Sequence, residues 1–184
     1  MHRSEAFFQD TEKIYQEILT APRQAIGEIG EADVVVGIPF YNEADTLAQV
    51  AQEAVEGIKT YYPESRAVLI CVGGPAGSRA LENLEKLPLD ARVQKIAFLL
   101  QNESLNGRGW ALRAIMELAY SLGADLALLE ADLLTQQING AKVGFQGLWL
   151  QSLLQPIREN AFDLVLAHFN RHYSEATITR HLVY

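Results

Sequence analysis

Apolar residues along the chain repeat with two different periods, one typical of helices and one typical of buried strands. Residues 4–19 carry apolar side chains at helical spacing, which predicts an amphipathic N-terminal helix that ends at Ala21-Pro22. A turn-like connection then reaches Glu31, and residues 33–40 (DVVVGIPF) form a continuous apolar run. Such a run is expected of a strand that is buried on both faces. The helix and its connection (1–30) therefore precede a domain that spans 31–184.

The same change of period recurs after this first strand. It predicts helices near 47–61, 81–87 and 111–122, and strands at 67–72, 95–100 and 124–132. Helices and strands that alternate at this spacing require right-handed crossovers. The sequence therefore predicts an α/β fold with a mainly parallel sheet and helices on both faces. Ligands of such sheets bind beyond the carboxyl ends of the strands, so function is sought in the residues after each strand.

Composition narrows the class of protein. The 184 residues suffice for one domain with a sizeable core, and the net charge of −8 argues against a nucleic-acid partner. The single cysteine excludes a disulfide within the chain. No apolar run approaches the roughly 20 residues of a membrane span, and the N-terminus lacks the apolar core of a signal peptide. We expect a cytoplasmic protein.

The first strand ends in residues that permit two interpretations. Pro39 turns the chain out of the sheet, and Asn42 or Asp45 can cap the next helix, which would be a purely structural role. In a functional role, Tyr41 offers its ring to a nucleotide base. Glu43 can accept hydrogen bonds from a ribose hydroxyl or a base N–H.

The second and third strands end in glycine-rich segments. Residues 73–78 lack the lysine of a phosphate-binding loop, which favours an ordinary loop. The third strand ends at Gln101, and Arg108 stands between two glycines just before the next helix. The N-terminus of a helix already favours anions, so a phosphate is the natural partner of an arginine placed there.

The fourth strand ends in two carboxylates, Glu130 and Asp132. Strand periodicity places both side chains on one face, where they repel each other unless a cation or water separates them. Mg²⁺ or Mn²⁺ suits such hard oxygen ligands, although paired carboxylates also occur as solvated strand ends. Together with Arg108 and the pair formed by Tyr41 and Glu43, they predict a nucleoside diphosphate site at one edge of the sheet.

Three segments resemble glycosyltransferases of the GT-A fold. Residues 34–43 (VVVGIPFYNE) resemble the first strand of the family 2 and related enzymes, and residues 107–132 resemble their GKG-helix-strand-DxD segment. Residues 168–179 (HFNRHYSEATIT) resemble the acceptor segment of the mannosylglycerate synthase and glucosyl-3-phosphoglycerate synthase group. The resemblance covers residues 33–184 with gaps. It implies a Rossmann-like GT-A nucleotide-binding domain behind the N-terminal helix.

The resemblance also implies a role for individual residues. Asp132 matches the metal ligand of DxD, for Mg²⁺ or Mn²⁺, and Arg108 stands where the family usually has lysine. Arg171 and Thr179 match positions that hold the carboxylate of the acceptor. The donor-binding positions are Pro39, Phe40, Tyr41, Glu43, Gln101, Arg108 and Glu130.

The expected reaction follows from this resemblance. A hexose would pass from a GDP- or UDP-sugar to a small hydroxy acid such as glycerate or phosphoglycerate, with retention of configuration. The metal held by Asp132 would stabilise the departing diphosphate as a Lewis acid, and Arg108 would add to that stabilisation.

The sequence departs from the family pattern in several places. Glu130 replaces the first Asp of DxD, and Arg108 replaces Lys. A further metal-binding histidine is expected, and the match assigns that role to none of His168, His172 and His181. The final HLVY resembles the start of a strand or helix, so we expect a fragment of a longer protein that lacks the acceptor-side lid and a metal ligand.

Other functions fit parts of the pattern. A non-catalytic nucleotide-sugar-binding or assembly domain of a larger protein would tolerate the altered motifs. A nucleotidyltransferase would need a basic, glycine-rich loop after the first strand, which PFYNE does not provide. The apolar stripe of the N-terminal helix suits packing on the sheet or against a second subunit of a homo-oligomer.

Overall fold

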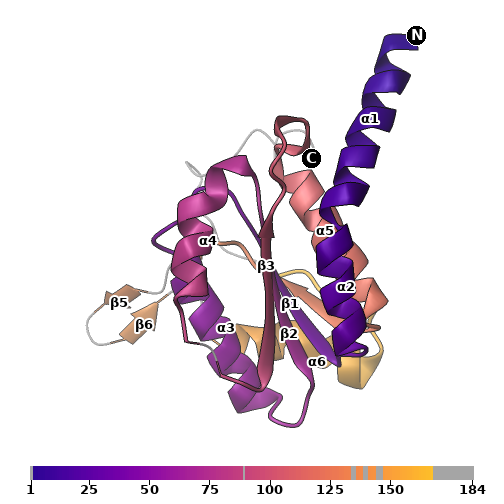
Figure 1. The fold of residues 1–184 in the computed structure, drawn as a ribbon. Coiled ribbons are helices and arrows are strands. Elements are labelled where there is room, and N and C mark those ends of the chain that lie inside the picture. Colours follow the sequence, from indigo (N-terminus) through magenta and orange to yellow (C-terminus); the bar gives the residue numbers. More distant parts are fainter. Residues whose placement is uncertain (1, 89, 134–135, 139–140, 144–146, 168–184) are drawn as a thin grey trace, which may run out of the picture.

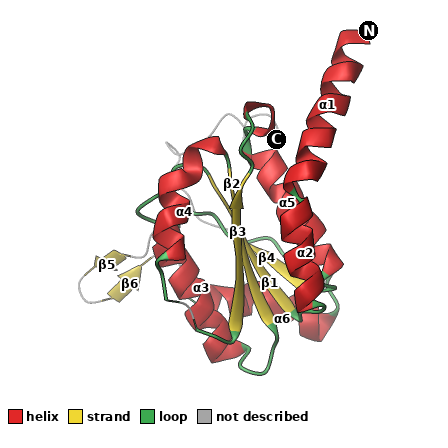
Figure 2. Ribbon diagram, viewed as in Figure 1, coloured by secondary structure: helices red, strands yellow, loops and turns green. Residues whose placement is uncertain are grey.

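Four parallel strands form the centre of the protein (Figure 2). The computed structural model describes residues 2–88, 90–133, 136–138, 141–143 and 147–167, and it describes the side chains of residues 8–88, 90–133 and 147–167. The sheet has the order β3-β2-β1-β4, and all of its pairings are parallel. Its strands are β1 (Val34–Phe40), β2 (Ala67–Gly73), β3 (Val93–Leu99) and β4 (Asp125–Leu128).

Helices cover both faces of this sheet (Figure 1). One face is covered by α3 (Leu47–Tyr61), α4 (Ser78–Glu85) and α6 (Leu148–Asn160). The other face is covered by α2 (Thr20–Ile29), α5 (Arg108–Ser121) and the end of α1 (His2–Ile18). The remaining elements are the 3-10 turns η1 (Pro75–Gly77) and η2 (Glu103–Leu105) and the hairpin of β5 (Gln136–Ile138) and β6 (Ala141–Val143). The predicted α/β architecture is thereby confirmed.

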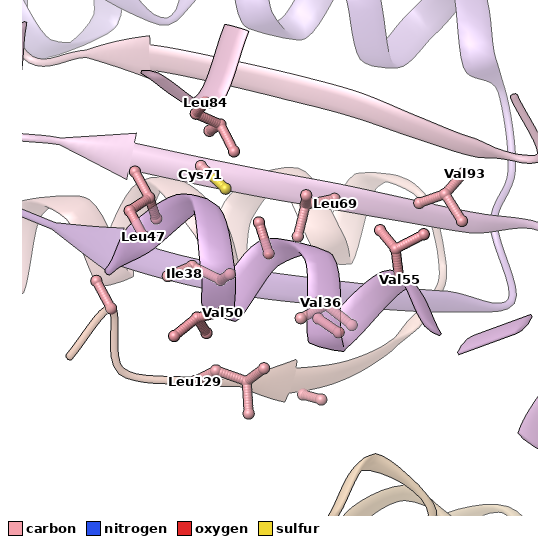
Figure 3. Close-up of a cluster of buried hydrophobic side chains, with 14 of the residues drawn as sticks. Val36, Ile38, Leu47, Val50, Val55, Leu69, Cys71, Leu84, Val93 and Leu129 are labelled. Atoms are coloured by element: carbon pink, nitrogen blue, oxygen red, sulfur yellow. The ribbon is translucent and has the colours of Figure 1, made fainter. Parts of the chain in front are cut away.

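Strand periodicity distributes the core between these two layers. Val36 and Ile38 of β1 pack with α3 and Leu69 of β2 (Figure 3), whereas Val35 packs with α5 on the opposite face. All seven residues of β1 and all seven of β2 are buried. Burial on both faces is the reason that these strands are continuously apolar instead of alternating.

The strand order changes direction once. From β1 to β2 to β3 the chain moves outward along the sheet, and α5 then carries it back across to β4, on the other side of β1. A right-handed return of this kind must cross the opposite face, which is where α5 lies. The reversal makes the carboxyl ends of β1 and β4 the expected ligand site.

Several predicted boundaries were wrong. The stretch before Glu31, predicted as a turn, is the helix α2, because Pro22 lies in its first turn, where proline is tolerated. Helix α5 begins at Arg108 instead of residue 111, and β4 ends at Leu128 instead of residue 132. The sequence analysis assigned neither α6 nor the β5–β6 hairpin.

Helix α1 is held to the domain by its second half, while its first half projects past the carboxyl edge of the sheet (Figure 1). Arg113 of α5 donates to both carboxylate oxygens of Glu12, over 2.6 and 2.8 Å. Its guanidinium also lies 4.4 Å from the ring centroid of Tyr15 and 5.3 Å from that of Trp110. Of the two arrangements that the apolar stripe permitted, the structure therefore contains packing on the domain.

Among the described residues, no helix combines the length and apolar character that a membrane crossing requires.

The contact between Glu12 and Arg113 predicts a pH-dependent stability. Hydrogen bonds from Arg113 lower the pKa of Glu12 from 4.5 to about 2. A depressed carboxyl pKa stabilises the fold above the pKa of the unfolded chain, and this contribution is lost as the pH falls through the folded value. Glu12→Gln should therefore lose less stability than the wild type between pH 5 and pH 2.

The difference should be at most about 1 kcal/mol, because the side chains of Glu12 and Arg113 are 41% and 39% exposed. Urea unfolding at several pH values measures it. Glu17→Gln on the same helix is the control, since Glu17 approaches Lys13 only to 4.0 Å and is 66% exposed. Equal pH profiles for the Glu12 variant and the wild type would contradict the expectation.

The contact between α3 and α6 depends on two glycines. A Cβ at Gly57 would lie 2.7 Å from both the Cα and the carbonyl oxygen of Gly147, which are backbone atoms that cannot rotate away. Gly57→Ala should lower the free energy of unfolding by about 1–3 kcal/mol, as measured by urea denaturation. A Cβ at Gly27 of α2 would meet no described atom within 4 Å, so Gly27→Ala should be neutral or stabilise by up to about 1 kcal/mol. Equal stabilities of the two variants would contradict this account.

Candidate functional site

A pocket of about 390 Å³ opens at the carboxyl ends of β1 and β4. Four segments that are far apart in the sequence contribute to it: the loop after β1, the end of β2, the start of α5 and the turn after β4. Its lining residues are Pro39, Phe40, Tyr41, Glu43, Gly74, Asn106, Gly107, Arg108, Ala111, Glu130, Ala131 and Asp132.

The pocket opens where β4 leaves the sheet beside Pro39. The N–H of Leu129 donates to the carbonyl oxygen of Gly37 over 2.9 Å, and the paired register of β1 and β4 ends at Gly37. Alternate residues of a strand direct their backbone groups to the same neighbouring strand, so the backbone of Pro39 faces β4 as that of Gly37 does. Proline, however, has no N–H to donate. The pairing therefore cannot continue there, and the space beyond Gly37 is left to the pocket.

Glu43 organises the loop after β1. One of its carboxylate oxygens accepts hydrogen bonds from the backbone N–H of Tyr41 at 2.6 Å and of Asn42 at 3.0 Å. Its carbonyl oxygen accepts from the N–H of Leu47 at the start of α3. The loop is thereby curled so that Tyr41, which is 45% exposed, borders the pocket.

Thr46 ties this loop to the turn after β4. It is the N-cap residue of α3, so the predicted caps Asn42 and Asp45 were wrong. Its hydroxyl donates to the carbonyl oxygen of Ala131 over 2.7 Å. The side chain makes no capping hydrogen bond to α3, and its hydroxyl connects two walls of the pocket instead.

Arg108 is the first residue of α5, and its guanidinium forms an ion pair with Glu130. Gly107 precedes it with φ of 138°, a backbone conformation that residues with a Cβ rarely adopt. The helix itself approaches β1 closely, since a Cβ at Gly37 would lie 2.3 Å from a methyl group of Ile115. Packing of α5 against β1 therefore positions Arg108 at the pocket.

Carboxylates outnumber cations in the pocket. Among the described lining residues the acidic and basic side chains are Glu43, Arg108, Glu130 and Asp132, which carry a formal net charge of −2. Within the described residues, no three His, Cys, Asp or Glu side chains come close enough together to form a ready-made metal site. A divalent cation bound at Asp132 would therefore take most of its ligands from water and from a bound phosphate, as Mg²⁺ commonly does.

The structure brings most of the predicted site residues together. Seven of them line the pocket: Pro39, Phe40, Tyr41, Glu43, Arg108, Glu130 and Asp132. Gln101 is exposed after β3 and lies outside the described lining. Arg171 and Thr179 lie outside the described residues, as do His168, His172 and His181.

Five lining residues were not among the predicted site residues: Gly74, Asn106, Gly107, Ala111 and Ala131. Gly74 was assigned to an ordinary loop, and Asn106 was not singled out, yet a Cβ at Gly74 would lie 3.3 Å from the ring of Tyr41 and 3.4 Å from Oδ1 of Asn106. The position of Gly74 directly after a strand was the available signal. Asn106 carried no comparable signal, because the turn that brings it to Gly74 is a tertiary feature.

A second hollow, of about 520 Å³, lies at the opposite end of β1 and β4. Its arginines are already paired with its acids: Arg66 with Glu31 and Asp33, and Arg158 with Asp125. The hollow lies at the amino ends of β1 and β4, whereas ligands of parallel sheets bind beyond the carboxyl ends, so it is a less suitable ligand site than the first pocket.

Comparison of the chain with protein-family models, with curated proteins and with solved structures finds no match. The architecture is an α/β fold with an all-parallel sheet, and it is compatible with a Rossmann-like fold.

The bond between Thr46 and Ala131 predicts a measurable contribution to stability. Thr46→Val keeps the shape of the side chain but leaves the Ala131 carbonyl without this donor, so the free energy of unfolding should fall by about 1 kcal/mol. Thr60→Val on the same helix is the control, because its hydroxyl bonds to the exposed carbonyl of Glu56. It should change stability by less than about 0.5 kcal/mol in urea denaturation. Equal effects would mean that Thr46 does not connect the two walls.

Proposed function

We propose that the pocket binds a nucleoside diphosphate sugar and that the protein is a metal-dependent hexosyltransferase of the GT-A type. The observation that carries this proposal is the convergence of Tyr41, Arg108 and Asp132 on one pocket from three distant segments. An aromatic ring, an arginine at a helix start and a carboxylate are the groups that a base, a diphosphate and its cation require.

The parts of the donor are assigned to different walls. The base stacks on the half-exposed ring of Tyr41, and the ribose lies towards Glu43. Arg108 would contact the diphosphate, and Asp132 would hold the Mg²⁺ or Mn²⁺ ion that accompanies it. This position also uses the N-terminus of α5, whose free N–H groups and dipole favour anions.

The net charge of the pocket supports a role for a cation. Among the described lining residues, three carboxylates and one arginine repel a doubly negative diphosphate, so a ligand of this class should bind more tightly when additional positive charge accompanies it. A divalent cation supplies that charge, and it also stabilises the departing diphosphate as a Lewis acid. Arg108 adds a second positive group to the same leaving group.

The acceptor half of the reaction rests on sequence resemblance. Arg171 and Thr179 correspond to positions that bind the carboxylate of a small hydroxy acid such as glycerate or phosphoglycerate. Retention of configuration is proposed on the same basis. No residue is assigned as a nucleophile or a catalytic base.

A non-catalytic nucleotide-sugar-binding domain is the second candidate. It is favoured by the ion pair between Arg108 and Glu130, which occupies two of the groups that a turnover-competent site would use. The two candidates differ in one measurement, the hydrolysis or transfer of hexose from UDP-glucose or GDP-mannose. Turnover that requires Mn²⁺ and that Asp132→Asn abolishes would identify the enzyme.

Donor binding is tested by calorimetric titration with UDP and GDP. One of the two should bind at least about tenfold more tightly with Mn²⁺ than without it, a difference of about 1.4 kcal/mol. Asp132→Asn should remove this dependence on Mn²⁺, because it removes the proposed metal ligand. The control is Asp10→Asn, an equal charge change at an exposed position on α1. Absence of binding by both nucleotides in the presence of Mn²⁺ would refute the donor site.

A further inference from the structure

Among the described residues that line the pocket, Arg108 is the single basic side chain, and it is already paired with Glu130. The planar guanidinium recognises carboxylates and phosphates through the same hydrogen-bond geometry. The carboxylate of Glu130 therefore stands where the oxygens of a bound phosphate would stand. A phosphate that binds through the same donor, Nη2 of Arg108, can do so only if the Glu130 side chain moves away.

The backbone around Glu130 is held in place, so this exchange is a side-chain rotation. Leu129 before it is buried and donates to Gly37, and Ala131 after it is buried and accepts from Thr46. The side chain of Glu130 itself is 43% exposed and that of Arg108 is 59% exposed. Both can reorient into solvent without disturbing the fold.

An internal carboxylate competes with an external anion at a high effective concentration, because it is tethered beside its partner. A displaced Glu130 also remains close to the bound anion and repels it. An anion with a single phosphate offers Arg108 little more than Glu130 does. A diphosphate has additional oxygens with which to contact the N-terminus of α5 or a cation, so it can displace the carboxylate.

We infer that Glu130 is a specificity-determining residue that occupies Arg108 in the free pocket and so selects diphosphates over single phosphate groups. The inference rests on the proposed function in that both place the diphosphate at Arg108. It differs from the role that sequence resemblance implies for Glu130, a contact to the ribose or the sugar.

The experiment uses inorganic pyrophosphate and orthophosphate as probes, titrated calorimetrically without divalent metal into the full chain. Glu130→Gln removes the competing charge and keeps the size of the side chain. It should bind orthophosphate about tenfold more tightly than the wild type, and its preference for pyrophosphate over orthophosphate should shrink.

Glu43→Gln is the matched control. It removes one negative charge from the same pocket, and its amide oxygen can still accept from the N–H groups of Tyr41 and Asn42, but it does not contact Arg108. It should raise the affinity for orthophosphate about twofold or less. The double variant Arg108→Gln with Glu130→Gln should lose the gain of the single Glu130 variant, because the freed guanidinium is gone.

Three results would overturn the inference: unchanged or weaker orthophosphate binding by Glu130→Gln, equal gains in the Glu130 and Glu43 variants, or a gain that persists without Arg108. Circular dichroism of each variant establishes that it is folded. Failure of the proposed function appears elsewhere, in the titration of the wild type with UDP and GDP in Mn²⁺. Tighter orthophosphate binding by Glu130→Gln would support the inference even if neither nucleotide binds.

Discussion

The structure depends on the burial of β1 between two neighbouring strands and two layers of helices. Each of its seven residues is buried, so its backbone N–H and C=O groups must be paired within the sheet, and a residue without an N–H is tolerated where no acceptor faces it. Pro39 meets this condition because β4 has already left the sheet on the side that Pro39 faces. The same departure of β4 opens the pocket, so the site is a consequence of how the central strand satisfies its hydrogen bonds.

Electrostatics then decides what this pocket can accept. Its arginine lies at the start of α5, where helix packing against Gly37 places it, and its carboxylates arrive from two other segments. The ion pair between Arg108 and Glu130 gives the free pocket an internal partner for the one basic side chain among its described lining residues. The proposed ligand, a nucleoside diphosphate with a metal ion, has several anionic oxygens with which to compete for such a site.

The order of elements from the first strand to the fourth was predictable, because it depends on local periodicity. Buried strands such as β1 and β2 are continuously apolar, and α3 and α5 carry apolar stripes at helical spacing. Boundaries were less predictable where tertiary contact overrides local preference. Pro22 was interpreted as a helix terminator, although it lies in the first turn of α2. Thr46 precedes α3 without a side-chain capping bond, and its hydroxyl donates to Ala131.

The sequence by itself determined the fold class and identified most residues of the pocket, because parallel strands place the residues that follow them at one edge. The tertiary structure decided how those residues contact one another. Only the folded chain brings Asn106 beside Gly74 and pairs Arg108 with Glu130, because these contacts join segments whose separation in the sequence carries no periodic signal. The close approach of α3 and α6 at Gly57 and Gly147 was equally unpredictable from the hydrophobic pattern of the sequence. It depends on how these two helices pack in space, and they are far apart in the chain, with β4 between them.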